Sequence, residues 1–331
     1  MAHSRPTIRD VASLAGVSHQ TVSRVINGEA RVTPETREKV QTAIRSLGFR
    51  PNAIARSMAT GATRTFICLS PNLTDYTFAC IIEGAQTEAR SQGYSLFSAS
   101  AQDAEEFADL VSQLIGSARA DGLMVINPYA DDRFAFVPAG VPTVFVGARP
   151  RAIAVSSVAL DDVEVGKIAT QHLLARGHRH IAMITGPGAE DCTQDRIRGY
   201  EMALHEAGAP INPEWRCEGD WSASSGYVAC MRMAGQGERP TAVFAQNDRM
   251  AVGVIRAGRD LGLRIPEDLA VIGVDDMPLA SYFDPPLTTM RQDLPAIGQQ
   301  AARLLLEAVD QPAAPVQHLL IPAQLVVRAS S

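Results

Sequence analysis

The first 50 residues have the hydrophobic spacing of three short helices. Apolar residues recur three and four positions apart, at Ile8, Val11, Ala12 and Ala15, then at Val22, Val25 and Ile26, and then at Val40, Ala43, Ile44 and Leu47. This spacing places the apolar side chains on one face of each helix. The sequence therefore predicts a small all-helical domain at the N-terminus.

Capping residues mark where these helices begin and end. Thr7 is followed three positions later by Asp10, which is the pattern of a capping box. Ser18 is placed to cap the second helix, Thr33 precedes a proline at the first position of the third, and Gly48 follows its end. The capping pattern thus agrees with the hydrophobic spacing.

The second helix has a polar face opposite its apolar one. A tight turn at residues 16–18 joins it to the first helix, as in a helix-turn-helix, and the polar face includes Gln20, Ser23, Arg24 and Asn27. Arg24 can donate two hydrogen bonds to guanine, and Gln20 can pair with adenine or accept from cytosine. The alternative is a face that only contacts solvent. The turn and the caps favour recognition of DNA.

From residue 65 onward, short apolar runs alternate with amphipathic stretches. Such alternation predicts parallel sheets covered by helices, that is, an α/β fold. The expected strands are 66–70, 94–99, 122–126, 143–146, 180–185, 242–245 and 269–274, and the expected helices include 78–92, 105–118 and 196–207.

A weak internal repeat divides this larger part into two halves. Gly84 is followed by Gly93, and Gly199 by Gly208, with the same spacing of nine residues. Two similar α/β halves predict two lobes with a cleft between them. In open α/β sheets ligands bind beyond the carboxyl ends of the strands. Residues 72–78, Asn127, Asn247, Asp248 and Asp275 follow strand ends and are candidates for the cleft.

The charge is distributed unevenly along the chain. Residues 1–60 contain nine Arg and Lys against four Asp and Glu, whereas the remaining residues contain 21 against 32. A basic domain on an acidic body indicates a nucleic-acid contact confined to that domain. A hydrophobic content of 46% excludes general disorder. We expect no membrane span and no export signal, and hence a cytoplasmic protein.

The N-terminal motifs resemble the DNA-binding domain of the LacI/GalR family of bacterial transcription regulators. The motifs are TIRDVA, AGVSHQTVSRVIN, TREKV, LGF and PNAIAR, at residues 7–12, 15–27, 36–40, 47–49 and 51–56. The resemblance implies a DNA-binding domain at 1–50, a hinge helix or linker at 51–64, and a core at 65–331. In that family a leucine of the hinge helix enters the minor groove, and Met58 stands at this position. The implied DNA contacts are Thr7, Ser18, His19, Gln20, Thr21, Ser23, Arg24, Asn27, Asn52, Ala55 and Met58.

The rest of the chain resembles the effector-binding core of the same family, which shares its two-lobed fold with periplasmic sugar-binding proteins. The motifs are ARGHRHI, QNDRMA, IGVDD and PLTTM, at residues 175–181, 246–251, 272–276 and 286–290. The resemblance implies that an arginine grips the effector, that an aromatic residue packs on it, and that polar side chains from both lobes surround it. The implied effector contacts are Asn72, Thr77, Phe78, Asn127, Arg196, Trp221, Asn247 and Asp275.

Several of these residues have a plainer interpretation. Trp221 could be an ordinary core residue, and Asp161 could either line the cleft or cap a helix. We expect Asp276 to lie in a solvated turn. The histidines His172, His178 and His180 do not have the spacing of a standard metal site, so a helix-to-strand junction explains them better and no metal or cofactor is expected. The five cysteines contain no CxxC pair.

The sequence favours a DNA-binding repressor controlled by a small molecule. The chain has no GxGxxG, Walker or GxSxG motif, so we do not expect an enzyme. The predicted effector is a sugar, and the alternatives are a nucleobase or nucleoside co-repressor or a protein co-regulator. A soluble sugar-binding protein is the alternative outside this class. The resemblance implies a homodimer on a near-palindromic operator in double-stranded DNA. We expect a dimer rather than a tetramer, because the C-terminus lacks leucine heptads.

Overall fold

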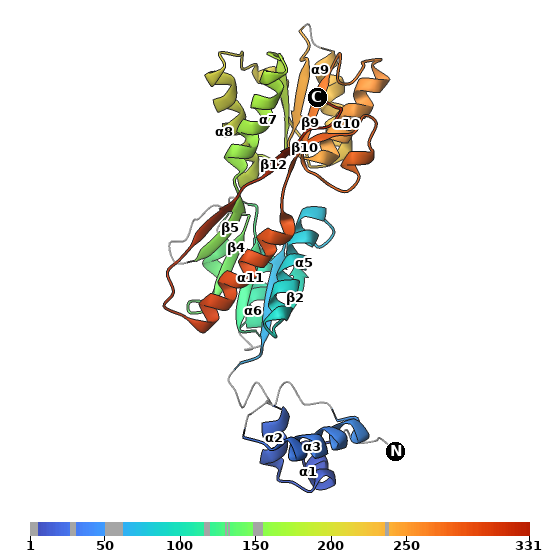
Figure 1. The fold of residues 1–331 in the computed structure, drawn as a ribbon. Coiled ribbons are helices and arrows are strands. Elements are labelled where there is room, and N and C mark those ends of the chain that lie inside the picture. The colour runs from blue at the N-terminus through green and yellow to red at the C-terminus, as the bar shows by residue number, and fades with distance from the viewer. Residues whose placement is uncertain are drawn as a thin grey trace. The chain divides into compact units, whose positions relative to one another are not determined.

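The structure of the protein, a computed structural model, consists of two compact units. It describes residues 6–26, 31–49, 62–115, 120–129, 131, 133–147, 155–235 and 238–331. Residues 1–63 form the first unit and residues 64–331 the second. The first contains short helices, and the second contains two lobes of parallel sheet flanked by helices (Figure 1).

The helices of the N-terminal unit begin and end where the sequence predicts. The Thr7 hydroxyl accepts a hydrogen bond from the Asp10 amide while the Asp10 carboxylate accepts from the Thr7 amide, which completes the capping box. The Ser18 hydroxyl accepts from the amide of Thr21, and Thr33 caps the third helix. The apolar faces meet in one core. The described helices of this unit are α1 (Ile8–Ala15), α2 (His19–Ile26) and α3 (Pro34–Leu47).

The first lobe of the second unit is built on a six-stranded sheet. Its strand order is β11-β5-β4-β3-β1-β2, and all neighbouring strands run parallel. The strands are β1 (Thr65–Ser70), β2 (Ser95–Ser100), β3 (Gly122–Ile126), β4 (Thr143–Val146), β5 (Ser156–Leu160) and β11 (His318–Ile321).

The second lobe repeats this arrangement. Its strand order is β12-β10-β9-β8-β6-β7, and only the β12 edge is antiparallel. In each lobe the second strand lies at one edge, next to the first. The strands are β6 (Ile181–Thr185), β7 (Arg216–Glu218), β8 (Ala242–Ala245), β9 (Ala270–Asp275), β10 (Thr288–Arg291) and β12 (Gln324–Val326).

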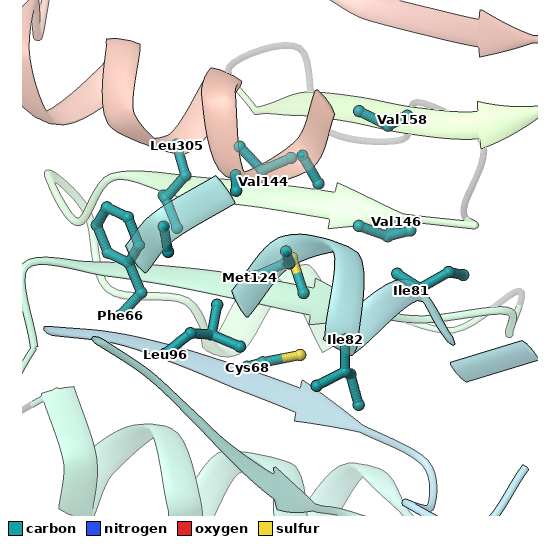
Figure 2. Packing of buried hydrophobic residues seen from close by; sticks show 14 of the residues in the cluster. Phe66, Cys68, Ile81, Ile82, Leu96, Met124, Val144, Val146, Val158 and Leu305 are labelled. Atoms are coloured by element: carbon teal, nitrogen blue, oxygen red, sulfur yellow. The ribbon is translucent and has the colours of Figure 1, made fainter. Parts of the chain in front are cut away.

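Alternate residues of a strand point to opposite faces of its sheet, so the apolar strands give each sheet two apolar faces. Helices cover both faces. Figure 2 shows one face in the first lobe, where Phe66, Cys68 and Met124 pack under α5 and α11. The helices of the first lobe are α5 (Tyr76–Ser91), α6 (Ala104–Ile115) and α11 (Leu294–Asp310), and those of the second are α7 (Asp162–Ala175), α8 (Asp191–Glu206), α9 (Ala223–Ala234) and α10 (Asp248–Asp260).

The repeated glycines have a physical reason in each lobe. A Cβ on Gly84 would lie 2.2 Å from the carbonyl oxygen of Pro295 in α11, and a Cβ on Gly199 would lie 2.0 Å from that of Val163 in α7. Both glycines therefore let the helix that follows the first strand of a lobe approach a neighbouring helix closely. Gly93 and Gly208 end these helices with positive φ. The sequence repeat thus reflects the repeated lobe.

The chain passes between the lobes three times. The crossings lie between β5 and α7, between β10 and α11, and between β11 and β12 (Figure 1). Each lobe is therefore completed by segments distant in the sequence. The predicted strands are confirmed within one residue at each end, while β5, β7, β10, β11 and β12 were not predicted. No helix in the described part of the chain combines the length and apolarity needed to cross a bilayer.

Candidate functional site

Helix α2 presents the polar face that the sequence predicts for contact with DNA. Val22 and Val25 are buried, whereas His19, Gln20 and Arg24 are exposed. The predicted contacts Ser18, Thr21 and Ser23 lie on or beside α2, and Thr7 belongs to the capping box of α1. The predicted contacts Asn27, Asn52, Ala55 and Met58, and the predicted hinge helix, lie outside the described residues.

A cavity of about 190 Å³ lies between the two lobes of the second unit. The carboxyl ends of β3, β4 and β5 line it from the first lobe, and the beginnings of α8 and α10 line it from the second. This is where an open α/β sheet binds ligands. Seven predicted effector contacts line the cavity: Asn72, Thr77, Phe78, Arg196, Trp221, Asn247 and Asp275.

The side chain of Asn127 does not line this cavity. Asn127 is buried at the end of β3, where its Nδ2 donates to Asp131 and its Oδ1 accepts from the Tyr129 amide. The strand-end rule located the correct edge of the sheet but could not show which way this side chain points. The structure gives Asn127 a role in the turn after β3.

Arg196 is held firmly within the second lobe. Its Nε donates to Oδ1 of Asp162 over 2.7 Å, and its Nη1 donates to the carbonyl oxygen of Gln246. The Arg196 side chain is 6% exposed and that of Asp162 is 11% exposed. Arg196 therefore joins α7, α8 and the start of α10 as well as lining the cavity. Two of its nitrogen atoms already have partners in the protein.

Trp221 lies in the cavity wall with φ of 67°, a conformation that non-glycine residues seldom adopt. Its ring packs on Gly186, where a Cβ would lie only 2.0 Å from the indole. Its Nε1 donates to Glu190 over 3.0 Å, and its carbonyl oxygen accepts from Nδ2 of Asn247. Glycine at 186 is thus required by the indole. Positive φ in a cavity wall is typical of functional positions.

Asn247 supports Trp221 and also caps a helix. Its Oδ1 accepts from the Met250 amide at the start of α10, while its Nδ2 binds the Trp221 backbone. Both ends of the amide therefore have protein partners. Asn247 lines the cavity, and its contacts hold the loop that contains Trp221 against the start of α10.

Asp275 ends β9 with φ of 122° and faces the same cavity. Its Oδ1 accepts from Nε2 of Gln292 over 2.7 Å. Burial, together with the nearby carboxylate of Asp248, raises the pKa of Asp275 well above its usual value. A ligand that donates a hydrogen bond or brings positive charge would favour the ionised form.

Glu190 is a cavity residue that the sequence analysis missed. Burial raises the pKa of the Glu190 carboxyl, and the hydrogen bond from Trp221 offsets part of this rise. Its backbone forms a β-bridge with Tyr129 of the first lobe, and the next amide, of Asp191, donates to the carbonyl oxygen of Pro128 over 2.9 Å. Glu190 therefore lies both in the cavity and at a contact between the lobes.

A second contact between the lobes lies at the start of α5 and α10. Nη2 of Arg249 donates to Oδ2 of Asp75 over 2.7 Å, and Oδ1 of Asp75 caps α5 by accepting from the Thr77 amide. Both charged residues line the cavity. A ligand in the cavity therefore lies next to an ion pair that spans the lobes.

The missed cavity residues lacked a local signal. Asp162 follows strand β5, which was not predicted, and Glu190 precedes α8, which begins five residues before the predicted helix. Recognising β5 would have brought Asp162 under the strand-end rule. Asp75 and Tyr76 belong to the predicted stretch 72–78, whereas the cavity residues not predicted include Tyr129, Asp162, Glu190, Cys192, Arg249 and Gln292.

Asp276 is not in a solvated turn, so that prediction is wrong. Its side chain is largely buried and forms ion pairs with Arg291 and Arg328, each over 2.6 Å. Both arginines come from segments distant in sequence, so local polarity could not reveal them. Asp161, for which two interpretations were open, caps α7 by accepting from the Glu164 amide.

The three histidines contact different partners. His172 bonds to the Ser331 hydroxyl, His178 to the Thr241 hydroxyl, and His180 approaches Glu238 and packs near the Trp215 ring. Among the described residues no group of three or more His, Cys, Asp or Glu side chains could hold a metal ion. The cavity instead offers aromatic faces, hydrogen-bond donors and carboxylates, which is the chemistry of reversible binding.

Two families match different parts of the chain. Residues 7–52 match the family described as bacterial regulatory proteins, lacI family, and residues 170–331 match the periplasmic binding protein-like domain.

Full-length relatives and solved structures match nearly the whole chain. The HTH-type transcriptional repressor PurR of Vibrio vulnificus (strain CMCP6) is 35% identical over 97% of both chains, and that of Haemophilus influenzae (strain PittEE) is 36% identical over 98% of both. The lac repressor dimer bound to operator and the anti-inducer ONPF is 32% identical over 99% of both chains, with a TM-score of 0.90. The complex of the transcriptional regulator CelR with cellobiose is 33% identical over 99% of this chain and 100% of that one, with a TM-score of 0.77.

Proposed function

The chain belongs to the LacI family of bacterial regulatory proteins and is a DNA-binding transcriptional repressor, and from this premise we propose that a small molecule bound between its lobes controls a homodimer on a near-palindromic operator. The observation on which this proposal depends is the cavity between the lobes, lined from both sides by aromatic and polar residues.

Helix α2 supports the DNA-binding part of the proposal. Its N-terminal residues His19 and Gln20 are exposed, as is Arg24 one turn later, and Val22 and Val25 anchor the opposite face. In helix-turn-helix proteins such a helix enters the major groove. We assign base recognition to Arg24 and Gln20, because both side chains can form bidentate hydrogen bonds with base edges.

Exposed apolar side chains support a homodimer. Phe97 is 62% exposed on β2, an edge strand of the first lobe, and Leu73 is exposed before α5. In the second lobe Leu279 and Tyr282 are 57% and 83% exposed. A pair of identical subunits would bury such residues in a symmetric interface. One solved neighbour is described as a dimer bound to operator.

The contacts between the lobes support control by a ligand. The Asp75–Arg249 ion pair and the bridge between Tyr129 and Glu190 both join the lobes at the cavity. A ligand shifts the equilibrium between two arrangements only by binding one of them better. Because this cavity has walls from both lobes, its occupant contacts groups that move when the lobes rearrange.

We propose a sugar as the first candidate for the effector and a nucleobase or nucleoside as the second. One solved neighbour is a cellobiose complex, which supports a sugar, whereas the curated relatives are repressors named PurR, which supports a nucleobase or nucleoside. The indole of Trp221 beside Arg196 and Asp275 suits the apolar face and hydroxyl edge of a sugar ring. The further aromatic residues Tyr76 and Phe78 in the cavity lining favour a planar base.

The test combines ligand binding with operator binding. Operators would be selected from random DNA duplexes with the purified protein, and thermal shifts would then be measured against a set of sugars, nucleobases and nucleosides. We expect a ligand that raises the unfolding temperature to change operator affinity as well. A ligand that binds with no effect on the operator would contradict the proposed control. A ligand whose affinity is unchanged in Trp221→Ala would lie outside this cavity.

A further inference from the structure

The cavity contains more carboxylates than guanidinium groups. Its described lining includes four carboxylates, of Asp75, Asp162, Glu190 and Asp275, and two guanidinium groups, of Arg196 and Arg249. Arg196 pairs with Asp162 over 2.7 Å, and Arg249 pairs with Asp75 over 2.7 Å. Both guanidinium groups therefore already have carboxylate partners.

Glu190 and Asp275 form no ion pair with any described residue. Glu190 accepts hydrogen bonds from the Trp221 indole, at 3.0 Å, and from the more distant Cys192 thiol, whereas Asp275 accepts from the Gln292 amide at 2.7 Å. These donors are neutral. A carboxylate held away from water is stabilised most strongly by a cationic hydrogen-bond donor.

We infer that the effector has a protonated nitrogen, which binds in the cavity against the carboxylates of Glu190 and Asp275. This inference rests on the proposed function, since it concerns the ligand that occupies the same cavity. It narrows the sugar candidates to amino sugars, and it admits other small ring compounds that have an amine. The nitrogen supplies the charged donor that the protein does not provide to these two groups.

Trp221 adds to the preference for a cation. An indole face attracts a nearby positive charge more strongly than other aromatic rings do. The Arg196 guanidinium carbon lies 6.0 Å from the centre of the Trp221 ring, so this indole already has a cation at the outer limit of such contacts. The Trp221 ring also lines the cavity, so a ligand ammonium placed over its face would gain the same attraction.

Ligand charge is also coupled to the arrangement of the lobes. The Glu190 backbone bridges to Tyr129 of the first lobe, and its side chain reaches the cavity from the second. A cation bound to Glu190 therefore acts where the two lobes touch. Burial raises the pKa of both carboxyl groups, and the nearby guanidinium of Arg196 lowers both only in part. The carboxylate of Asp75 raises both, Asp248 also raises that of Asp275, and Arg249 lowers that of Asp275. A bound cation therefore favours the ionised forms and releases protons. The affinity for an amine should accordingly rise with pH until both carboxyl groups are ionised in the free protein.

The experiment compares amines with neutral counterparts. The probes are D-glucosamine against D-glucose and N-acetyl-D-glucosamine, D-galactosamine against D-galactose, and tyramine against 4-(2-hydroxyethyl)phenol. Calorimetric titrations use the full chain and its variants Glu190→Gln and Asp275→Asn. Glu214→Gln, an exposed carboxylate outside the cavity lining, is the matched control. Far-ultraviolet circular dichroism checks that each variant folds.

We expect at least one amine to bind at least tenfold more tightly than its neutral counterpart. Loss of one charge-assisted hydrogen bond should reduce this preference about tenfold or more in Glu190→Gln and leave it unchanged in Glu214→Gln. Titrations in buffers of different ionisation enthalpy should show proton release for the amine alone. Glu190→Gln keeps an acceptor for the Trp221 indole, so a loss of preference reports charge.

Three results would overturn the inference. The neutral counterparts could bind as tightly as the amines, or none of the amines could bind. The third result is a preference for the amine that persists in both Glu190→Gln and Asp275→Asn. Operator binding separates these from a failure of the proposed function. A neutral ligand that changes operator affinity would support the proposed function and overturn the inference that the effector has a protonated nitrogen. An amine that binds through Glu190 without changing operator affinity would support the inference and overturn the proposed control.

Discussion

Nε of Arg196 and Oδ1 of Asp162 lie 2.7 Å apart, in an ion pair that joins helix α8 to the first residue of α7. Both side chains are largely buried, so neither is well solvated. The pair lines the cavity and fixes the packing of two helices at the same time. A residue that resemblance assigns to the effector is thus part of the framework as well.

Arg196→Ala should destabilise the protein. The substitution leaves Asp162 buried without its cation, which typically costs about 3–5 kcal/mol when one partner of a buried ion pair is removed. Urea unfolding monitored by circular dichroism measures this change. The double variant Arg196→Ala/Asp162→Ala should recover part of the loss, because the unpaired charge is gone. Equal stabilities of Arg196→Ala and the wild type would contradict this role of the pair.

Arg24→Ala should weaken operator binding by about 1–3 kcal/mol, the usual contribution of a bidentate base contact. Its affinity for random DNA should change much less, since base recognition is lost and most phosphate contacts remain. Fluorescence anisotropy on a selected operator and on random duplex measures both. Lys39→Ala, on α3 and paired with Glu35, serves as the control. Equal losses on the two DNAs would show that Arg24 contacts only phosphate.

Tyr282→Asp should shift the protein from dimer to monomer. Burial of a large apolar side chain contributes about 1.5–3 kcal/mol, and the buried charge in each subunit opposes association further. The dimer dissociation constant should therefore rise more than tenfold, and operator affinity should fall with it. Analytical ultracentrifugation measures the dissociation constant. Ile211→Asp changes an exposed residue before β7 and should remain dimeric. A dimeric Tyr282→Asp would place the interface elsewhere.

Asp248 should make the stability of the protein depend on pH. Burial raises the pKa of its carboxyl to about 7, and hydrogen bonds from Thr289 and the Met277 amide oppose this only in part. The folded state therefore holds a proton that the unfolded chain, with a pKa near 4, releases. This contribution to stability is fully present below about pH 4 and is lost as the pH rises through about 7, at up to about 1.4 kcal/mol per pH unit.

The variant Asp248→Asn isolates this contribution, because an amide does not titrate. Urea unfolding at pH 5 and at pH 7.5 should show a larger difference for the wild type than for Asp248→Asn. Asp109→Asn, on the exposed face of α6, should behave as the wild type does. Parallel pH dependence in the wild type and Asp248→Asn would mean that Asp248 ionises normally.

The sequence by itself determined the elements whose signals are local. The helices of the N-terminal unit follow from caps at Thr7, Ser18 and Thr33, because a capping side chain bonds to an amide only two or three residues away. The central strands follow from continuous apolar runs, because both faces of each sheet are buried. The repeated glycines indicated two lobes, because each permits a close helix contact within its own lobe.

Only the tertiary structure decided the edges of the sheets and the partners within the cavity. Strand β11 is a four-residue strand with no fully buried residue, and Leu319 pairs with Val158 across more than half of the second unit. Likewise Asp276 is buried by Arg291 and Arg328, and Glu190 meets Trp221 31 residues further along the chain. Strand β11, Asp276 and Glu190 are each stabilised by a group that is distant in the sequence. Such contacts exist only after the chain has crossed between the lobes, which is why no local pattern of residues could reveal them.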